Sequence, residues 1–348
     1  MRVVVFGDSF IGLDVFRSAF EGIARTQEVR FVEMNEGDRL VPSTPSEKSL
    51  REYLGSTGQV RSELGDAEVL VVHGAPVSEE VMASGRALKI VCCARGGPVN
   101  VDVAAATRMG IPVVTAPGKN AEAVAELAAT LMVMLSRNVI RAYNHVITEK
   151  VVGKDNYEGI QFVGHELDGK TLGLIGFGRV GSRVAKRAIA FGMSVLVFDP
   201  FLDSTVVESH GVKAVSLDEV LGCDFVSLHA RESKENEGLM GRGQFSKMKP
   251  GSYFINTARP SMVDEEALLE ALKSGRLAGA AMDVVRYDPA RPVNPLVGLG
   301  NVLVMPHIGG ATHETTTKGA FIVAQQLERH LRGESMETII NPEALKTP

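Results

Sequence analysis

Residues 171–184, with the sequence TLGLIGFGRVGSRV, give the clearest indication of the fold of this chain. Its first five residues form a short apolar run that is typical of a buried strand, and a turn with Gly176, Gly178 and Gly181 follows at once. After the turn, apolar residues recur at helical spacing. A strand, a glycine-rich turn and a helix in this order are typical of the first unit of a dinucleotide-binding fold.

The glycine-rich turn carries the parts that a pyrophosphate site needs. Gly176 permits a tight turn, Gly178 lets the backbone approach the anion, and Gly181 lets the helix pack closely on the strand. The anion would lie at the positive end of the helix, beside Arg179 and Val180. The turn is therefore expected to bind a dinucleotide.

Asp199 indicates which dinucleotide to expect. It ends the next predicted strand, 18 residues after Gly181, where a carboxylate can accept hydrogen bonds from both ribose hydroxyls. The same carboxylate would repel a 2′-phosphate, and the segment VFDPF holds no Arg or Lys to receive one. The sequence therefore predicts NAD rather than NADP.

Length and composition narrow the class of protein. The 348 residues are 45% hydrophobic and 23% charged, which is ordinary for a globular chain and long enough for two domains. The net charge is −5 without a basic stripe, so no nucleic-acid partner is expected. With no signal peptide and no run of about 18 apolar residues, we expect neither export nor a membrane. Three cysteines without zinc spacing favour a cytoplasmic protein that binds no metal.

Short apolar runs alternate with helical stretches along the chain, which predicts an α/β fold with doubly wound parallel sheets. Five strands are expected in a first sheet, at residues 3–6, 30–33, 69–72, 89–92 and 113–115. Six are expected in a second sheet, at residues 171–175, 194–198, 224–228, 252–255, 280–284 and 302–305. A long helix should open after Asn120. A second amphipathic helix is expected over residues 316–332, with Phe321, Ala324, Leu327 and Leu331 on its buried face.

Three polar residues follow strands of the second predicted sheet. Because ligands of open parallel sheets bind beyond the carboxyl ends of the strands, Arg259, Asp288 and His307 are expected along one edge. Arg259 would clamp the carboxylate and polarise the carbonyl of a 2-keto acid, and His307 would act as the acid/base. Asp288 would accept the second ring N–H of His307. These are the parts for hydride transfer between a nicotinamide and a 2-keto acid.

Other interpretations of these residues stay open on the sequence alone. His229 also follows a strand; it is a second candidate for the acid/base and a better one for lining the cofactor site. His313 could cap a helix, and Arg259 could form a surface ion pair. Asp288 could simply start a turn before Pro289.

Six segments together resemble the D-isomer-specific 2-hydroxyacid dehydrogenases, the family that includes phosphoglycerate, glycerate and glyoxylate dehydrogenases. The segments are CCARGGPVNVD, GIPVVTAPGKNAEAVAE, ELDGKTLGLIGFGRVG, MKPGSYFINTAR with VDEEAL, LAGAAMDV and NVLVMPHIGGAT. The resemblance implies a Rossmann NAD-binding domain over residues 120–313, inserted in a flavodoxin-like substrate domain of residues 1–119 and 314–348. It also implies NAD(H) as cofactor and, usually, a homodimer.

The resemblance implies roles for further residues. It gives Arg259 and His307 the roles argued above, and the loop of Arg95, Gly96 and Gly97 would present backbone N–H groups to the substrate carboxylate. Asp283, at the end of AAMDV, would accept a hydrogen bond from the nicotinamide carboxamide. The implied cofactor-binding positions are Gly176, Gly178, Arg179, Val180, Gly181, Asp199, His229, Thr257 and Asp283.

The chain departs from the family pattern at several positions. Asp288 stands in place of the usual Glu and is one methylene shorter, and Pro260 replaces the usual Gly after Arg259. His73 stands where phosphoglycerate-using members carry a phosphate-binding Arg, which disfavours a phosphorylated substrate. The chain ends soon after residue 342, so no C-terminal regulatory domain is expected.

The sequence thus predicts an NAD-dependent oxidoreductase that interconverts a small D-2-hydroxy acid and its 2-keto acid. The alternative is a non-catalytic NAD(H)-sensing binding protein, similar to the related transcriptional corepressors. Retention of Arg259, Asp288 and His307 favours the enzyme.

Overall fold

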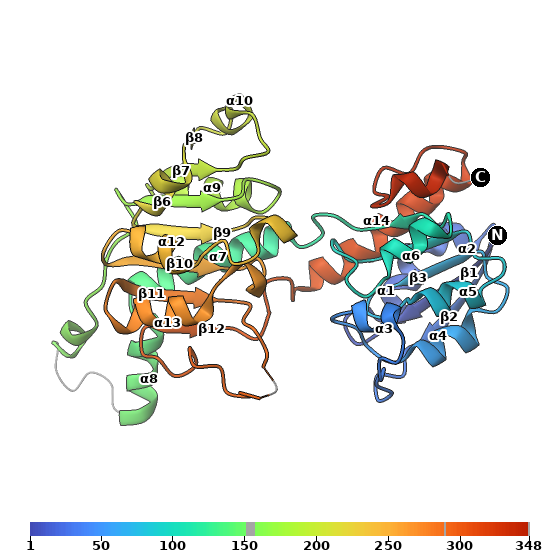
Figure 1. Cartoon of the computed structure of the whole chain (residues 1–348), viewed down its shortest axis with the longest axis horizontal. Coiled ribbons are helices and arrows are strands. Elements are labelled where there is room, and N and C mark those ends of the chain that lie inside the picture. Colours follow the sequence, from blue (N-terminus) through green and yellow to red (C-terminus); the bar gives the residue numbers. More distant parts are fainter. Residues whose placement is uncertain (151–156, 289, 347–348) are drawn as a thin grey trace. The chain divides into compact units, whose positions relative to one another are not determined.

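The computed structural model describes residues 1–150, 157–288 and 290–346. It divides into two compact units: unit 1 comprises Met1–Asn120 with Thr312–Pro348, and unit 2 comprises Ala121–Ala311. Each unit holds one wholly parallel sheet, of five strands in unit 1 and of seven in unit 2 (Figure 1). The predicted α/β class with two parallel-sheet domains is confirmed.

The sheet of unit 1 has the strand order β2-β1-β3-β4-β5. Its strands are β1 (Arg2–Gly7), β2 (Glu28–Glu33), β3 (Val69–Val72), β4 (Ile90–Cys93) and β5 (Val113–Val114). Every residue of β3, β4 and β5 is buried, because helices cover both faces of a parallel sheet. The helices of unit 1 are α1 (Leu13–Ala19), α2 (Glu21–Ala24), α3 (Pro45–Ser49), α4 (Thr57–Leu64), α5 (Glu79–Ser84), α6 (Val103–Arg108), α14 (His313–Leu331) and the 3-10 helix η4 (Pro342–Lys346).

Helix α14 returns the chain to unit 1 and packs on α1. The Thr312 side chain caps it by accepting a hydrogen bond from the Thr315 N–H at 3.2 Å. Its buried face carries Ala320, Val323, Ala324 and Leu327. Phe321 was predicted on that face and is 44% exposed, because it lies one position, about 100°, away from the stripe centred on Ala320 and Ala324.

The sheet of unit 2 has the order β12-β11-β10-β9-β6-β7-β8. Its strands are β6 (Thr171–Ile175), β7 (Ser194–Phe198), β8 (Lys213–Ala214), β9 (Phe225–Leu228), β10 (Ser252–Asn256), β11 (Leu277–Met282) and β12 (Val302–Val304). The prediction of six strands was wrong by one. The additional strand, β8, has two residues and pairs only with β7 at the edge of the sheet, so it has no apolar run to predict it.

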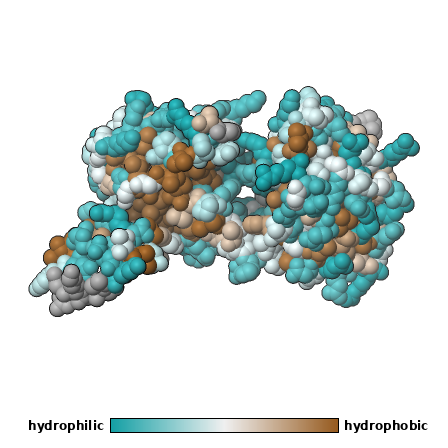
Figure 2. Space-filling view, turned by 90° about the horizontal axis from the view of Figure 1, so that it is seen from below, coloured by the Kyte–Doolittle hydropathy of each residue, from teal (hydrophilic) through white to brown (hydrophobic). Residues whose placement is uncertain are grey.

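The helices of unit 2 cover both faces of its sheet, with one exception. They are α7 (Ala121–Ser136), α8 (Val139–Glu149), α9 (Gly181–Ala190), α10 (Ser204–Glu208), α11 (Leu217–Leu221), α12 (Arg242–Lys247), α13 (Glu265–Lys273) and the 3-10 helices η1 (Glu158–Phe162), η2 (Lys234–Asn236) and η3 (Pro260–Met262). Helix α7 is largely buried, whereas α8 has no buried residue. Hydrophobic side chains accordingly reach the surface of unit 2 (Figure 2).

Among the described helices, no single one is long and apolar enough to cross a bilayer. Helices α7 and α8, which meet at a bend of 65°, would together be long and apolar enough by length and composition only. Since α7 is mostly buried in the core of unit 2, the pair is weak evidence for a span.

The strand order of each sheet defines where a ligand is expected. In unit 2 the chain runs from β6 to β7 and β8 and then crosses to β9, so the order reverses between β6 and β9. In unit 1 the reversal falls between β1 and β3. Ligands of open α/β sheets bind beyond the carboxyl ends of the strands at such a switch point. Ligands are therefore expected at the loops after β6, β9, β1 and β3.

Candidate active site

The glycine-rich turn lies at the switch point of unit 2. Gly176 follows β6 with φ +94°, and a Cβ on it would lie 2.6 Å from the backbone nitrogen of Ala230 in the loop after β9. A Cβ on Gly181 would collide with the carbonyl oxygen of Gly176, whereas one on Gly178 would have no atom within 4 Å. Gly176 and Gly181 are thus required by packing, and Gly178 leaves open space beside the N-terminus of α9, which suits a pyrophosphate.

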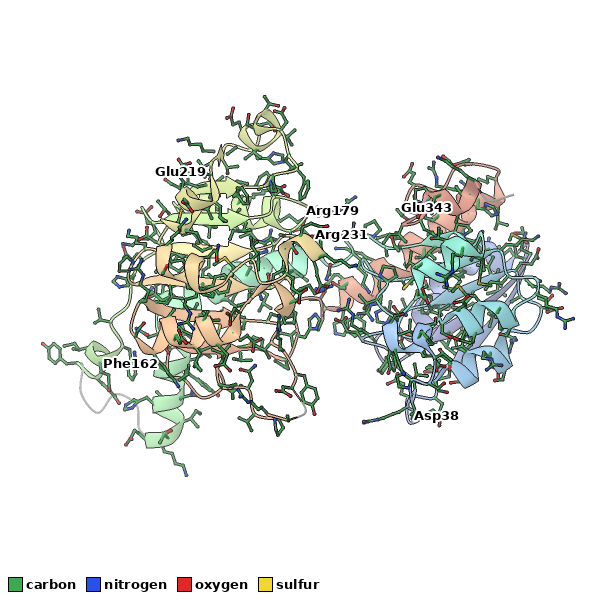
Figure 3. All side chains as sticks on the ribbon, viewed as in Figure 1. Asp38, Phe162, Arg179, Glu219, Arg231 and Glu343 are labelled. Carbon is green, nitrogen blue, oxygen red and sulfur yellow. The ribbon has the colours of Figure 1, made fainter. Side chains whose placement is uncertain are left out.

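Asp199 follows β7 and is tied to this turn. Its two carboxylate oxygens accept hydrogen bonds from the N–H groups of Phe177 at 2.8 Å and Phe201 at 3.0 Å. Each oxygen keeps a second lone pair for a further donor. Arg179 is exposed, and Figure 3 shows it with Arg231 at the edge of unit 2 that holds the carboxyl ends of these strands.

His229 follows β9 and faces two hydroxyl groups. The Ser227 Oγ lies 2.8 Å from its Nε2, and the Oγ1 of the buried Thr257 lies 3.4 Å from its Nδ1. Burial lowers the pKa of His229 to about 4, so the ring is neutral near pH 7. A neutral ring with a neighbour at each nitrogen fits the lining of the cofactor site better than an acid/base.

His307 follows β12 and has an unusual backbone. Its φ is +57°, in the left-handed region that non-glycine residues rarely adopt, and its side chain is exposed. Asp283, after the neighbouring strand β11, holds this conformation: its carbonyl oxygen accepts from the His307 N–H at 3.0 Å. Its buried carboxylate accepts from the N–H groups of Ile308 at 2.8 Å and Gly309 at 2.9 Å.

This arrangement is specific to the sequence around His307. A Cβ on Gly309 would lie 2.7 Å from the Asp283 carboxylate, so only glycine admits that contact. Strained backbone that is held by a buried charge is often found at functional positions. Asp283 therefore positions His307, a role that the sequence did not predict. The predicted contact of Asp283 with the carboxamide stays a prediction.

Arg259 lies beyond β10, the strand on the other side of β11 from β12. Its Nη1 donates to the carbonyl oxygen of Ala258 at 2.7 Å. Among the described residues, no carboxylate lies within ion-pair distance of its guanidinium. Because β10, β11 and β12 are neighbours, Arg259, Asp283 and His307 line one edge of the sheet, and Arg259 has donors left for an anionic ligand.

Asp288 is exposed, and the contacts of its carboxylate lie in its own loop. Its Oδ1 accepts from the Ala290 N–H at 2.9 Å, and it lines an open hollow with Glu265 and Arg286. Within the described ranges, no hydrogen bond or ion pair joins Asp288 to His307, and Pro289 lies outside those ranges. The structure thus brings Arg259 and His307 to one edge but does not place Asp288 against His307.

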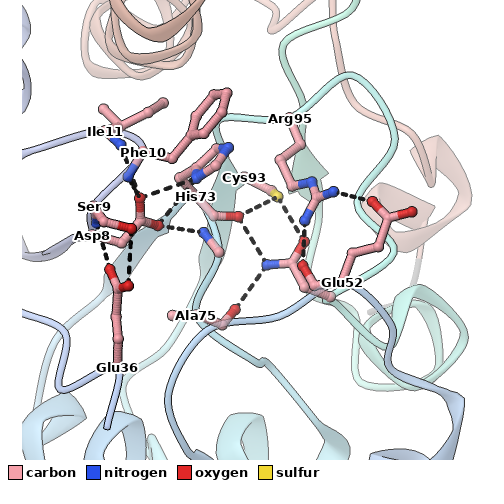
Figure 4. A network of polar contacts seen from close by, with 12 residues as sticks. Asp8, Ser9, Phe10, Ile11, Glu36, Glu52, His73, Ala75, Cys93 and Arg95 are labelled. Atoms are coloured by element: carbon pink, nitrogen blue, oxygen red, sulfur yellow. Dashed lines mark hydrogen bonds and ion pairs between the residues drawn. The ribbon is translucent and has the colours of Figure 1, made fainter. Parts of the chain in front are cut away.

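At the switch point of unit 1, a buried pair joins the loops after β1 and β3 (Figure 4). The Asp8 carboxylate lies 3.1 Å from the Nδ1 of His73 and accepts from the N–H groups of Ile11 and Gly74, each at 2.8 Å. Burial raises the pKa of Asp8, but these contacts lower it more, so the group is ionised. Burial lowers the pKa of His73 against the effect of Asp8. Phe10 stacks on the His73 ring, with centroids 4.9 Å apart.

The loop after β4 carries Arg95, Gly96 and Gly97. The Arg95 guanidinium donates to the carbonyl oxygen of Glu52 at 2.6 Å and forms an ion pair with the Glu52 carboxylate (Figure 4). Neither the Gly96 N–H nor the Gly97 N–H donates to another described residue, and no atom lies within 4 Å of a Cβ built on Gly97. Two adjacent N–H groups without an acceptor among the described residues are able to donate to an anion.

Lys119 follows β5, and sequence analysis assigned it no role. It is 8% exposed, and its Nζ has no hydrogen-bond partner among the described residues. The sequence could have indicated a ligand-binding role, because Lys119 stands in TAPGKN just beyond a strand of a parallel sheet. The burial of Lys119 could not be predicted, because it depends on packing against α14, far along the chain.

Comparison with known proteins agrees with this geometry. Residues 129–309 match the family model of the D-isomer specific 2-hydroxyacid dehydrogenase, NAD binding domain. The chain is 40% identical over 291 residues to D-3-phosphoglycerate dehydrogenase of Archaeoglobus fulgidus, which covers 82% of this chain and 54% of that protein. It is 37% identical over 272 residues to glyoxylate reductase of Korarchaeum cryptofilum, which covers 78% and 81%.

A solved structure of similar fold is the TT0316 protein from Thermus thermophilus, with a TM-score of 0.78 and 30% identity over 98% of this chain and 100% of that chain. The chain belongs to the D-isomer-specific 2-hydroxyacid dehydrogenase family, and residues 129–309 are its NAD-binding domain. It spans about half the length of the phosphoglycerate dehydrogenases that it matches. Its described residues contain no group of three or more His, Cys, Asp or Glu side chains placed to bind a metal.

Proposed function

We propose that this protein is an NAD-dependent oxidoreductase that interconverts a small D-2-hydroxy acid and its 2-keto acid. The observation that carries the proposal is the arrangement of Arg259 and His307 at the carboxyl ends of the strands in the seven-stranded sheet. There Arg259 has no carboxylate partner within the described ranges, and His307 is held in a strained conformation two strands away. The relatives named dehydrogenase and reductase support it.

Unit 2 would hold the cofactor. The open space beside Gly178 suits the pyrophosphate, with Arg179 and Val180 beside it, and Asp199 suits the ribose hydroxyls. His229 and Thr257 would line the site near the nicotinamide, and Asp283 would accept from its carboxamide. NAD(H), when bound there, supplies or accepts the hydride.

Arg259 and His307 would act on the substrate. The guanidinium fork of Arg259 would bind the carboxylate and the carbonyl oxygen, which orients the reacting carbon and polarises its C=O bond. The His307 ring would give a proton to that oxygen during reduction and take it back during oxidation. Asp288 would accept the second ring N–H during the reaction, although no hydrogen bond joins it to His307 within the described residues.

Unit 1 would bind the substrate carboxylate. The free N–H groups of Gly96 and Gly97 are the donors, and the ion pair of Arg95 with Glu52 fixes their loop. The neutral His73, held by Asp8, offers no second cation at the position of the family's phosphate-binding Arg. We therefore expect an unphosphorylated substrate.

The test is a panel of 2-keto acids, phosphorylated and not, assayed with the purified protein by loss of NADH absorbance. We expect turnover of at least one small unphosphorylated 2-keto acid, and NADH to be used in preference to NADPH. Tight NADH binding without turnover on any member would contradict the proposal and would favour the NAD(H)-sensing alternative.

We further propose that the protein forms a homodimer in the cytoplasm. Helix α8 exposes Val139, Tyr143 and Ile147, which recur every four residues and therefore share one face. A second copy of the chain is the proposed partner, as a homodimer in the cytoplasm. Light scattering of the purified protein should give twice the chain mass, and a Tyr143→Lys variant should shift it toward the monomer.

A further inference from the structure

Lys119 combines burial with an unpaired positive charge. Its ammonium is buried in unit 1, and no described residue accepts a hydrogen bond from it. Buried charges in proteins are ordinarily paired, because removal from water without a partner is costly. Burial is also the main cause that lowers the pKa of Lys119, to about 8, so the group is still mostly charged near pH 7.

The surrounding residues hold the Lys119 side chain in one place. Its Nζ lies over the ring of Phe10, 5.5 Å from the centroid. On the other side is Gly319 of α14, where a Cβ would lie 3.0 Å from the Cδ and 3.3 Å from the Nζ of Lys119. The same Cβ would lie 2.8 Å from the carbonyl oxygen of Ala94. Any larger residue at position 319 would therefore crowd the lysine.

The neighbouring carboxylates are already engaged. The Asp8 carboxylate accepts from His73 and from backbone N–H groups, and the Glu52 carboxylate binds Arg95. Burial raises the pKa of the Cys93 thiol to about 11, so it carries no charge that could pair with Lys119. Within the described part of this edge, the positive charge of Lys119 is left over.

A loop with two N–H groups that have no acceptor among the described residues lies next to this charge. A Cβ on Gly96 would contact the carbonyl oxygen of Ala116 and the backbone of residues 117 and 118, which lead directly into Lys119. The free N–H groups of Gly96 and Gly97 therefore belong to the same corner of the unit as Lys119. One cation and two N–H donors complement the negative charge of a carboxylate and leave at least one of its roughly four acceptor positions for a further donor.

We propose that Lys119 forms an ion pair with the substrate carboxylate, together with the N–H groups of Gly96 and Gly97, and so selects ionised 2-hydroxy and 2-keto acids. This inference rests on the proposed function for the identity of the ligand. It adds a binding residue that accounts for the buried, unpaired ammonium.

The experiment compares the full-length protein with Lys119→Met and with Lys48→Met, whose parent lysine is exposed on α3. The probe is oxamate, a small carboxylate that resembles a 2-keto acid, titrated by calorimetry in the presence of NADH. We expect Lys119→Met to bind oxamate roughly 10- to 100-fold more weakly, since a charge-assisted hydrogen bond is lost. Lys48→Met should bind it as the wild type does.

Two further readouts separate binding from structure. Without ligand, Lys119→Met should melt at a higher temperature than the wild type, because a buried unpaired charge has been replaced by an apolar chain of similar length. With oxamate, the wild type should gain thermal stability and Lys119→Met should gain little. In turnover assays the variant should raise KM, and it should discriminate less between a 2-keto acid and its uncharged amide.

The outcomes distinguish this inference from the proposed function. Equal oxamate affinity in wild type and Lys119→Met, or no oxamate binding by the wild type, overturns the role of Lys119. Oxamate binding that depends on Lys119 in a protein without dehydrogenase activity would support the anion site and reject the oxidoreductase. A lower melting temperature with unchanged oxamate affinity would make Lys119 a packing residue.

Discussion

The two sheets differ in whether the charged side chains at the carboxyl ends of their strands are paired. In unit 1 the ionisable groups are mostly paired: the buried Asp8 with the buried His73, and the partly exposed Arg95 with the exposed Glu52. In unit 2 His307 is exposed, and Arg259 has no carboxylate partner among the described residues. Among the described residues, the paired groups of unit 1 form a network in which Lys119 alone keeps an unpaired charge, whereas Arg259 and His307 of unit 2 belong to no such network.

At the amino ends of the strands in the seven-stranded sheet, a charged side chain is paired, as Asp8 is in unit 1. Asp224, just before β9, accepts from the Thr171 N–H at 3.0 Å and from the Lys249 Nζ at 2.6 Å. In unit 2 this paired carboxylate lies at the amino ends of the strands, whereas Arg259 and His307 lie at the carboxyl ends. In this sheet the stabilising ion pair and the candidate catalytic residues therefore lie at opposite ends of the strands. In unit 1 the paired Asp8 and the unpaired Lys119 both follow the carboxyl ends of strands.

The largest expected effect tests the exposed edge of unit 2. His307→Asn keeps a residue that tolerates the left-handed backbone but removes the acid/base, so turnover of a 2-keto acid should fall roughly 10²- to 10⁴-fold. Affinity for NADH, measured by calorimetry, should change little. His330→Asn, at an exposed histidine near the end of α14, is the matched control. Unchanged turnover would remove His307 from the mechanism.

The next effect tests the paired edge of unit 1. Asp8→Ala leaves His73 and two buried N–H groups without their acceptor, so the free energy of unfolding should fall by about 3 kcal/mol. Asp288→Ala, at the exposed carboxylate of unit 2, should change it by less than about 0.5 kcal/mol. Urea denaturation followed by circular dichroism measures both. Equal decreases in the free energy of unfolding for the two variants would contradict the proposed difference between the two units.

A smaller effect tests the geometry of the Arg259 guanidinium. Arg259→Lys keeps the charge but loses the planar fork, so kcat/KM should fall roughly 10- to 100-fold. Stability should be unaffected, because the Arg259 side chain hydrogen-bonds only to the Ala258 carbonyl in the described structure. Arg242→Lys, at an exposed ion pair with Glu270, serves as the control. Loss of stability in Arg259→Lys would show that the guanidinium is structural.

The smallest effect depends on pH and concerns the amino edge of unit 2. Burial raises the pKa of Asp224, but Lys249 and Thr171 lower it more, to about 2. Because the folded-state pKa lies below the ordinary value, this carboxylate stabilises the protein above about pH 4, and the contribution disappears as the pH falls toward 2. Asp224→Asn should therefore cost about 1 kcal/mol at pH 7 and almost nothing at pH 2. A loss of stability that does not vary with pH would contradict this account.

Local patterns in the sequence predicted most of the architecture. The strands at residues 69–72, 171–175 and 194–198 were predicted to the residue, because each is an apolar run with clear boundaries. The switch-point loops followed from the α/β pattern, so the positions of Gly176, Arg259 and His307 after strands could also be predicted. Strand β8 could not be, because a two-residue edge strand has no pattern of its own.

Contacts between distant segments were harder to predict. The role of Asp283 in holding His307 depends on the pairing of β11 with β12, and the burial of Lys119 depends on Gly319 of α14. The predicted partnership of Asp288 with His307 assumed that two strand-end loops meet. In the described structure Asp288 binds its own loop instead.

By itself, the sequence determined the α/β class, the glycine-rich turn and the acidic residue after β7, because periodicity and turn chemistry act over a few neighbouring residues. The family followed from the same short segments. Only the tertiary structure decided which charges are paired and which are left over. That is so because the pairing of a side chain depends on burial and on neighbours that come from strands and helices far apart in the chain.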